Sequence, residues 1–224
     1  KGLPTETSGN AQITVGNYGQ ADYKASAGGA FDENGTLRGR IALASLNRDG
    51  YGRNLYLEED VTDKDTFAMR AELGAYIGED FDVQIAFDKM IDNSNPRGAQ
   101  MLAPNAFGPG LLITPKTAPL EDRYDVRSGM PGVNETVMKG ASLTANYRAS
   151  EDWSFKYIFA QRESGTDTYI DFDTLPQQIT DVKAFYDDEQ ISQELQAHFD
   201  GGGASRGVVM ISSEMPELLG MCDR

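Results

Sequence analysis

Apolar and polar residues alternate along several stretches of about ten residues, each bounded by a turn or a long polar segment. In residues 66–76, the odd-numbered positions from Phe67 to Ala75 are apolar, whereas the even-numbered positions include Arg70 and Glu72. A period of two places one set of side chains on each face of a β-strand, and a helix cannot produce it. The sequence therefore predicts an all-β chain.

The same alternation predicts strands in further stretches. They are residues 23–28, 37–44, 81–88, 137–148, 153–160 and 190–199. No stretch is hydrophobic throughout, and the polar faces carry charges of both signs. Such segments are typical of a transmembrane β-barrel of the outer-membrane type. They are also compatible with a soluble antiparallel sheet that covers a core with one face.

The lengths of the connections favour the barrel. Tight turns are predicted at residues 32–35, 78–80 and 149–152. Long irregular segments are predicted at residues 47–64, 92–135 and 164–188. Short turns at one end and long outer loops at the other are typical of outer-membrane barrels.

Composition excludes several classes of function. The net charge of −15 argues against nucleic-acid binding, and with one cysteine, Cys222, the chain has no internal disulfide framework. With one histidine, His198, the usual catalytic triads and metal clusters are excluded, so we expect no enzyme. His198 shares the polar parity of Gln196 and is expected to be an ordinary lining residue.

One acidic run is similar to a metal-binding segment. Asp171-Phe172-Asp173-Thr174 resembles part of a calcium ligand set, but it lacks the glycine and the terminal glutamate of an EF-hand loop. The sequence therefore predicts no metal ion and no cofactor.

Several motifs, in their order and spacing, resemble the first barrel strands of TonB-dependent outer-membrane receptors. The motifs are residues 16–20 (GNYGQ), 24–31, 37–42 (LRGRIA), 48–51 (RDGY), 54–56 (NLY), 63–70 (DKDTFAMR) and 192–196 (SQELQ). The resemblance covers about residues 8–203. It implies an antiparallel transmembrane β-barrel fragment, with about eight of the roughly twenty-two strands of a large barrel. It also implies the outer membrane of a Gram-negative bacterium.

The resemblance implies an active importer of a bulky nutrient such as siderophore-bound iron, cobalamin or a glycan. Its partners would be outer-membrane lipid, the nutrient, and TonB acting through an N-terminal plug outside this chain. The chain opens at Lys1 without Met, so we expect it to be part of a longer protein in which residues 1–4 end the plug or link it to the first strand.

Substrate contacts in such receptors come from the plug, the lumen and the outer loops. The best candidates here are Tyr51, Arg53 and Tyr56, together with the long loop of residues 92–135. The alternative function is a soluble or small-barrel β-sheet module that binds or adheres without transport.

The alternation changes after Arg206. Residues 207–211 form a continuous apolar run, and residues 212–224 read as an acidic amphipathic helix. This segment resembles the strand and helix after the Walker B region in ATP-binding subunits of sugar ABC importers, with Ser213 near the switch residue. The resemblance predicts a buried parallel strand and a helix capped by Ser213 with Pro216 in its first turn.

The chain contains no GxxxxGK[ST] loop, so this tail is not expected to bind ATP. We therefore divide the chain into a partial barrel over residues 1–203 and a foreign tail over residues 204–224. The hypothesis is that two unrelated coding sequences meet between about residues 201 and 207. The alternative is that residues 207–213 form the ninth barrel strand.

Overall fold

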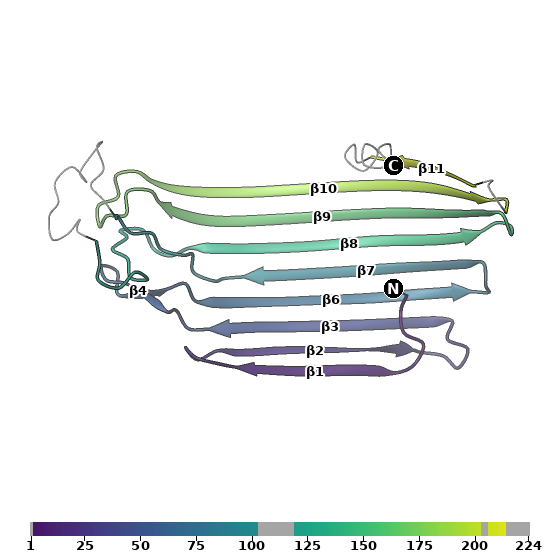
Figure 1. Cartoon of the computed structure of the whole chain (residues 1–224), viewed down its shortest axis with the longest axis horizontal. Coiled ribbons are helices and arrows are strands. Elements are labelled where there is room, and N and C mark those ends of the chain that lie inside the picture. The colour runs from purple at the N-terminus through teal and green to yellow at the C-terminus, as the bar shows by residue number, and fades with distance from the viewer. Residues whose placement is uncertain (1, 103–118, 203–205, 214–224) are drawn as a thin grey trace.

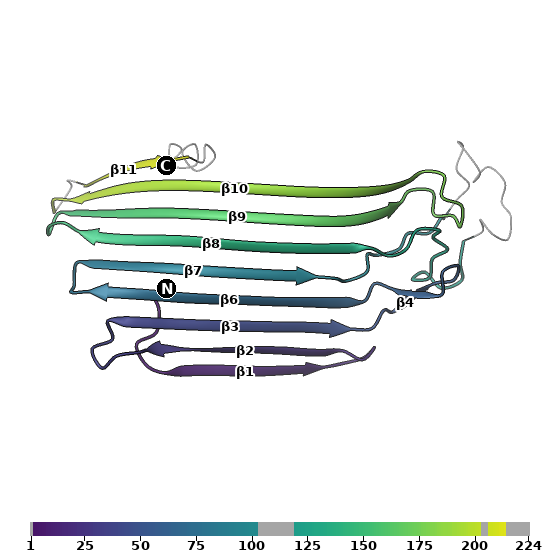
Figure 2. The same cartoon turned by 180° about the vertical axis from the view of Figure 1, so that it is seen from behind.

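The protein is an open antiparallel sheet in a computed structural model that describes residues 2–102, 119–202 and 206–213. The sheet has nine strands in the order β1-β2-β3-β6-β7-β8-β9-β10-β11, and β4 and β5 form a separate two-stranded sheet. Figures 1 and 2 show one elongated layer with tight connections at one end and larger loops at the other. No helix in these ranges is long and apolar enough to cross a membrane.

The strands follow the predicted alternation. Their bounds are β1 (Ser8–Val15), β2 (Ala21–Ala30), β3 (Leu37–Arg48), β4 (Gly52–Asn54), β5 (Glu59–Val61), β6 (Lys64–Ile77), β7 (Phe81–Asp92), β8 (Asn134–Arg148), β9 (Trp153–Asp171), β10 (Asp181–Asp200) and β11 (Arg206–Ser212). Each predicted strand is present, and the predictions of an all-β fold and of period-two strands are confirmed.

The register separates a polar face from an apolar face. Residues directly opposite each other point to the same side of a sheet, and Arg70 lies opposite Asp88 while Leu73 lies opposite Ile85. The apolar face leaves large side chains exposed on successive strands. They include Ile41, Leu43, Phe67, Leu73, Ile85, Phe87, Phe155 and Leu195. An exposed apolar surface of this extent marks an interaction site for a membrane or for another protein.

Neither form of the alternative β-sheet module appears in the described ranges. A sandwich needs a second sheet that buries the apolar face. The buried apolar residues of the described ranges are only Leu3, Val61, Ala86, Val126, Met130 and Leu175, so no second sheet covers that face. A small closed barrel needs its first and last strands paired, whereas β1 and β11 are the opposite edges of the sheet. The main strands of the described ranges therefore form one open sheet.

The tight turns lie where they were predicted. In residues 32–35 the N–H of Gly35 donates to the carbonyl of Asp32 at 3.1 Å, and in residues 149–152 the N–H of Ala149 donates to the carbonyl of Trp153 at 3.0 Å. Gly78 in the third turn has a φ of +66°, which glycine adopts at low cost.

The prediction of a long irregular loop over residues 164–188 was wrong. β9 continues to Asp171 and β10 begins at Asp181, so the strands have 19 and 20 residues. Threonine and tyrosine, as in Thr166, Thr168 and Tyr169, favour extended backbone. Polar and apolar residues do not alternate regularly in these parts of β9 and β10, so hydrophobic periodicity gave no signal for them.

The prediction of a buried parallel strand in the tail was also wrong. β11 pairs antiparallel with β10 from Asp200↔Arg206 to Glu194↔Ser212, and most of its side chains are exposed. The edge of β10 offers free backbone groups, and an antiparallel ladder satisfies them. Residues 206–212 are therefore the ninth strand of this sheet. Ser213, the predicted helix cap, donates its N–H to the carbonyl of Gln193, and the predicted helix beyond it falls on residues outside the described ranges. β11 nevertheless places Val208 opposite the polar-face residue His198.

The residues before β1 lie on the polar face of the sheet. Leu3 is only 6% exposed; its N–H donates to the hydroxyl of Tyr76 at 3.2 Å and its carbonyl accepts from Arg38 at 3.4 Å. Gly74 makes room for it, because a Cβ there would stand 2.8 Å from the Leu3 side chain. The chain thus enters its first strand from the polar side.

Candidate functional site

The loops at one end of the sheet pack into a compact unit, which we call the loop cap. It consists of residues 49–63, 93–102, 119–133 and 172–180, and it lies at the end of Figure 1 where β4 is labelled. Its small core contains Val61, Val126, Met130 and Leu175, each at most 4% exposed. Because these residues come from separate connections, the loops hold one another in place and form a preorganised surface.

Asn54 anchors the β4–β5 hairpin inside this unit. The residue is 1% exposed; its side-chain N–H donates to the carbonyl of Ser128 at 3.0 Å, and its Oδ1 accepts from Tyr56 at 3.0 Å and Leu57 at 3.3 Å. Backbone hydrogen bonds join Arg53 and Leu55 to Val126 on either side. The hairpin is therefore clamped to the segment of residues 124–128.

Gly52 is required for this clamp. A Cβ at Gly52 would lie 2.0 Å from the backbone carbonyl oxygen of Tyr124. A backbone oxygen cannot move aside as the end of a flexible side chain can, so only glycine allows β4 to approach the second loop so closely.

The sequence-predicted candidates occupy this hairpin. The Tyr51 ring makes edge contacts with Tyr18 at 6.1 Å and Tyr124 at 5.0 Å between ring centroids, and the guanidinium of Arg48 lies 4.8 Å from its centre. Arg53 and Tyr56 are exposed on the same hairpin. The structure therefore brings Tyr51 together with Tyr18 and Tyr124, and it leaves Arg53 and Tyr56 exposed on the same hairpin.

Sequence reasoning missed most of this cluster. Tyr18 comes from the β1–β2 turn, where its φ of +59° is uncommon for a non-glycine residue, and Tyr124 comes from the loop before β8. The guanidinium of Arg123 also lies 4.6 Å from the centre of the Tyr124 ring. Hydrophobic periodicity carries no signal for contacts between irregular segments. Of the long candidate loop 92–135, residues 103–118 lie outside the described ranges.

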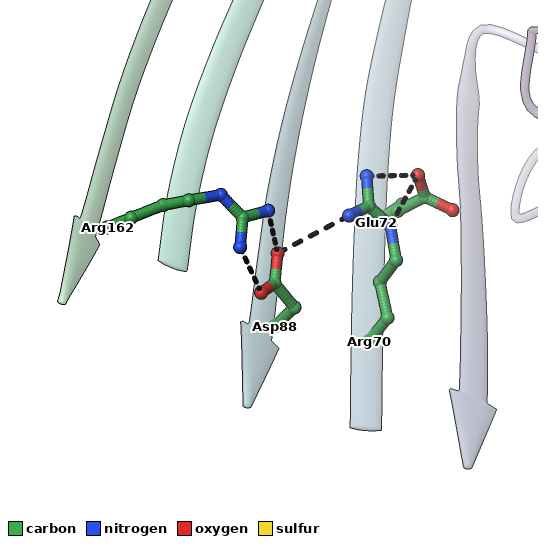
Figure 3. A network of polar contacts seen from close by, with 4 residues as sticks. All are labelled: Arg70, Glu72, Asp88 and Arg162. Carbon is green, nitrogen blue, oxygen red and sulfur yellow. Dashed lines mark hydrogen bonds and ion pairs between the residues drawn. The ribbon is translucent and has the colours of Figure 1, made fainter. Parts of the chain in front are cut away.

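A charged network crosses the polar face of the sheet (Figure 3). Asp88 on β7 accepts from Arg70 on β6 at 3.3 Å and from Arg162 on β9 at 3.4 Å, and Arg70 also pairs with Glu72 at 3.0 Å. Gly140 on β8 lies between Asp88 and Arg162 in the register. A Cβ there would approach the carboxylate of Asp88 to 3.2 Å, so this glycine leaves space for the two side chains to meet.

Half-exposed ion pairs contribute only about 0–1 kcal/mol each. The network therefore contributes little to the free energy of unfolding. Its main effect is to hold charged side chains of both signs in fixed positions on the polar face. His198 lies on the same face, where its Nε2 is 2.8 Å from the side-chain oxygen of Gln196. It therefore lies on the polar face, as its position in the alternation predicted.

Comparison with solved structures identifies the fold. The ferric yersiniabactin uptake receptor FyuA of Yersinia pestis matches with a TM-score of 0.71 and 16% identity, over 93% of this chain and 30% of that receptor. The ferripyoverdine receptor of the Pseudomonas aeruginosa outer membrane matches with a TM-score of 0.63 and 15% identity, over 95% and 28%. The ferric-catecholate import receptor Fiu of E. coli K12 gives 0.63 and 8%, over 94% and 32%.

The chain thus has the fold of part of the β-barrel wall of such receptors, and it spans about a third or less of their length. No family model and no curated protein matches the sequence. The proteins with the similar fold are transport receptors, not enzymes.

Proposed function

We propose that this chain is part of the barrel wall of an outer-membrane receptor of a Gram-negative bacterium that imports a bulky nutrient. One observation carries the proposal: a single antiparallel sheet, apolar on one face and polar on the other, matches the wall of solved receptors over 93–95% of the chain. The apolar face would contact outer-membrane lipid, and the polar face would line the lumen.

Ferric chelates are the first choice of nutrient. The solved receptors of this fold are named for ferric yersiniabactin, ferripyoverdine and ferric catecholate. Cobalamin and glycans are the remaining candidates. Energy would come from TonB through a plug inside the lumen, and residues 2–4 lie on the face that such a plug would contact.

The loop cap is the proposed first contact for the nutrient. Tyr51, with Tyr18 and Tyr124 against its ring, offers aromatic surface, and the exposed Arg53 and Tyr56 add a cation and a hydroxyl. Such a set suits a large, flat, negatively charged chelate, because aromatic rings contribute contact area and arginine contributes charge-assisted hydrogen bonds.

The test is a binding screen on the 224-residue chain refolded in detergent. Ferric catecholate, ferric hydroxamate, cobalamin and an oligosaccharide are titrated in by calorimetry. One ferric chelate is expected to bind, and Tyr51→Ala or Arg53→Gln should weaken it about tenfold, as for a binding hot spot. Tyr23→Ala, an exposed tyrosine of β2 on the apolar face, should have no effect.

Two results would contradict the proposal. A chain that stays monomeric and folded without detergent would be a soluble β-module, since the exposed apolar face would then tolerate water. If neither Tyr51→Ala nor Arg53→Gln weakens binding, the nutrient does not bind at the loop cap.

A further inference from the structure

Three aspartates converge where the β9–β10 hairpin opens into the loop cap. Asp171 ends β9, Asp181 begins β10, and the two lie directly opposite each other in the ladder. Asp173 lies in the connecting loop, and one carboxylate oxygen from each of the three lies within 4.8 Å of the other two. Like charges directly opposite each other destabilise a sheet.

Part of this cluster is held in place by the loop backbone. The Oδ2 of Asp173 accepts the N–H groups of Ile179 at 3.0 Å and Thr180 at 2.8 Å, and its Oδ1 accepts that of Leu175 at 2.9 Å. The Oδ1 of Asp171 accepts the N–H of Thr174. The carboxylates of Asp171 and Asp173 are therefore oriented by the loop backbone.

The remaining oxygens are buried without a partner. Asp171 Oδ2 and both oxygens of Asp181 each expose less than 1 Å² and have no hydrogen-bond partner within the described part of the chain. Burial raises the pKa of Asp181 to about 6, and the charges of Asp171 and Asp173 add to the effect. Carboxylate oxygens that are shielded from water and lack a hydrogen-bond partner are unfavourable unless a cation lies against them.

We propose that Asp171, Asp173 and Asp181 bind a Ca²⁺ ion at the base of the loop cap. Oxygens that share one Ca²⁺ at about 2.3–2.6 Å lie at most about 5 Å apart, whereas Mg²⁺ usually keeps several of its waters and is less often held by protein oxygens alone. The three carboxylate oxygens all lie within 4.8 Å of one another, so a single ion can contact all of them. An all-carboxylate set also suits a hard cation, whereas zinc prefers nitrogen and sulfur ligands.

The site would stiffen the surface above it. Leu175, two residues after Asp173, is 2% exposed, and its carbonyl accepts the N–H of Gly129 at 2.9 Å. Gln178 donates to the carbonyl of Gly129 at 2.7 Å. A bound cation would therefore fix the β9–β10 loop against residues 128–130. This inference stands independently of the transported nutrient.

Calorimetric titration of CaCl₂ into the 224-residue chain in detergent tests the proposal. One site is expected, with a Kd of about 10⁻⁴–10⁻³ M, as in extracellular calcium modules. Asp181→Asn should weaken binding at least tenfold. Asp187→Asn is the matched control, because it removes the same charge from the same strand outside the cluster.

A second measurement separates a metal ligand from a merely structural residue. Without calcium, Asp181→Asn relieves repulsion, so its Tm should equal or exceed that of the wild type. With calcium, only the wild type and Asp187→Asn should gain Tm and protease protection of residues 172–180. Should Asp181→Asn fail to refold, Asp171→Asn serves the same test.

The proposal is overturned if the wild type binds no calcium up to about 10 mM, an order of magnitude above the weak end of the expected range. Equal affinity in Asp181→Asn would also overturn it, and Mg²⁺ binding as tight as Ca²⁺ binding would overturn the assignment to calcium.

Discussion

Asp32 holds the β2–β3 turn with one carboxylate. Its Oδ1 accepts the N–H of Leu37 at 2.6 Å, and its Oδ2 accepts the N–H of Thr36 at 3.0 Å. These hydrogen bonds, that of Leu37 first, favour the ionised form and lower the pKa of Asp32 from its ordinary 3.8. A single side chain thus sets the short connection that the sequence predicted here.

The substitution Asp32→Asn is expected to destabilise the sheet modestly at neutral pH and progressively less in acid. A carboxylate whose folded pKa is lowered stabilises the fold above its ordinary pKa, and this contribution is lost as pH falls through the lowered value. The measurement is the free energy of unfolding against pH for wild type, Asp32→Asn and the exposed neighbour control Glu33→Gln. A gap between wild type and Asp32→Asn that stays constant into acid would contradict the mechanism.

At the scale of elements, strands with one polar and one apolar face could be predicted, whereas β1 and the distal halves of β9 and β10 could not. β6 and β7 alternate because one face is polar and the other apolar, whereas the distal halves of β9 and β10 have no such contrast. β4 and β5 have three residues each, too few to show a period. Tyr51 could be predicted as a candidate because it lies in a long loop. Its contacts with Tyr18 and Tyr124 could not, because they depend on how separate loops pack.

The β4–β5 hairpin should depend on Asn54 as one cooperative element. Asn54→Ala removes the hydrogen-bond partner of the Ser128 carbonyl and of two backbone N–H groups, all part-buried, which costs about 1–3 kcal/mol. Hydrogen exchange should accelerate together in residues 52–61 and 124–130, with no change in β6 and β7. The exposed Asn17→Ala is the control, and uniform acceleration through the whole sheet would show that the loop cap is not a separate element.

At the scale of the whole molecule, the apolar face ends in an aromatic row near the tight turns. Trp153 is 43% exposed, and its ring centroid lies 6.1 Å from that of Phe155 and 5.0 Å from that of Phe199. Tyr147 pairs with both Phe155 and Phe81 across the neighbouring strands. Amphipathic aromatic rings gather at membrane–water boundaries, so this row would mark the lower edge of the lipid-facing band.

Trp153 is the only tryptophan in the chain, so its fluorescence reports this boundary directly. In lipid vesicles, quenchers attached near the head groups should quench Trp153 more than quenchers deep in the acyl chains, and aqueous iodide should quench it least. The matched control carries Trp153→Phe with Gln196→Trp, which moves the probe to the polar face, where iodide should quench it and lipid quenchers should not. If Trp153 and the relocated tryptophan respond alike, the two faces of the sheet do not contact different phases, and the membrane assignment fails together with the transport proposal.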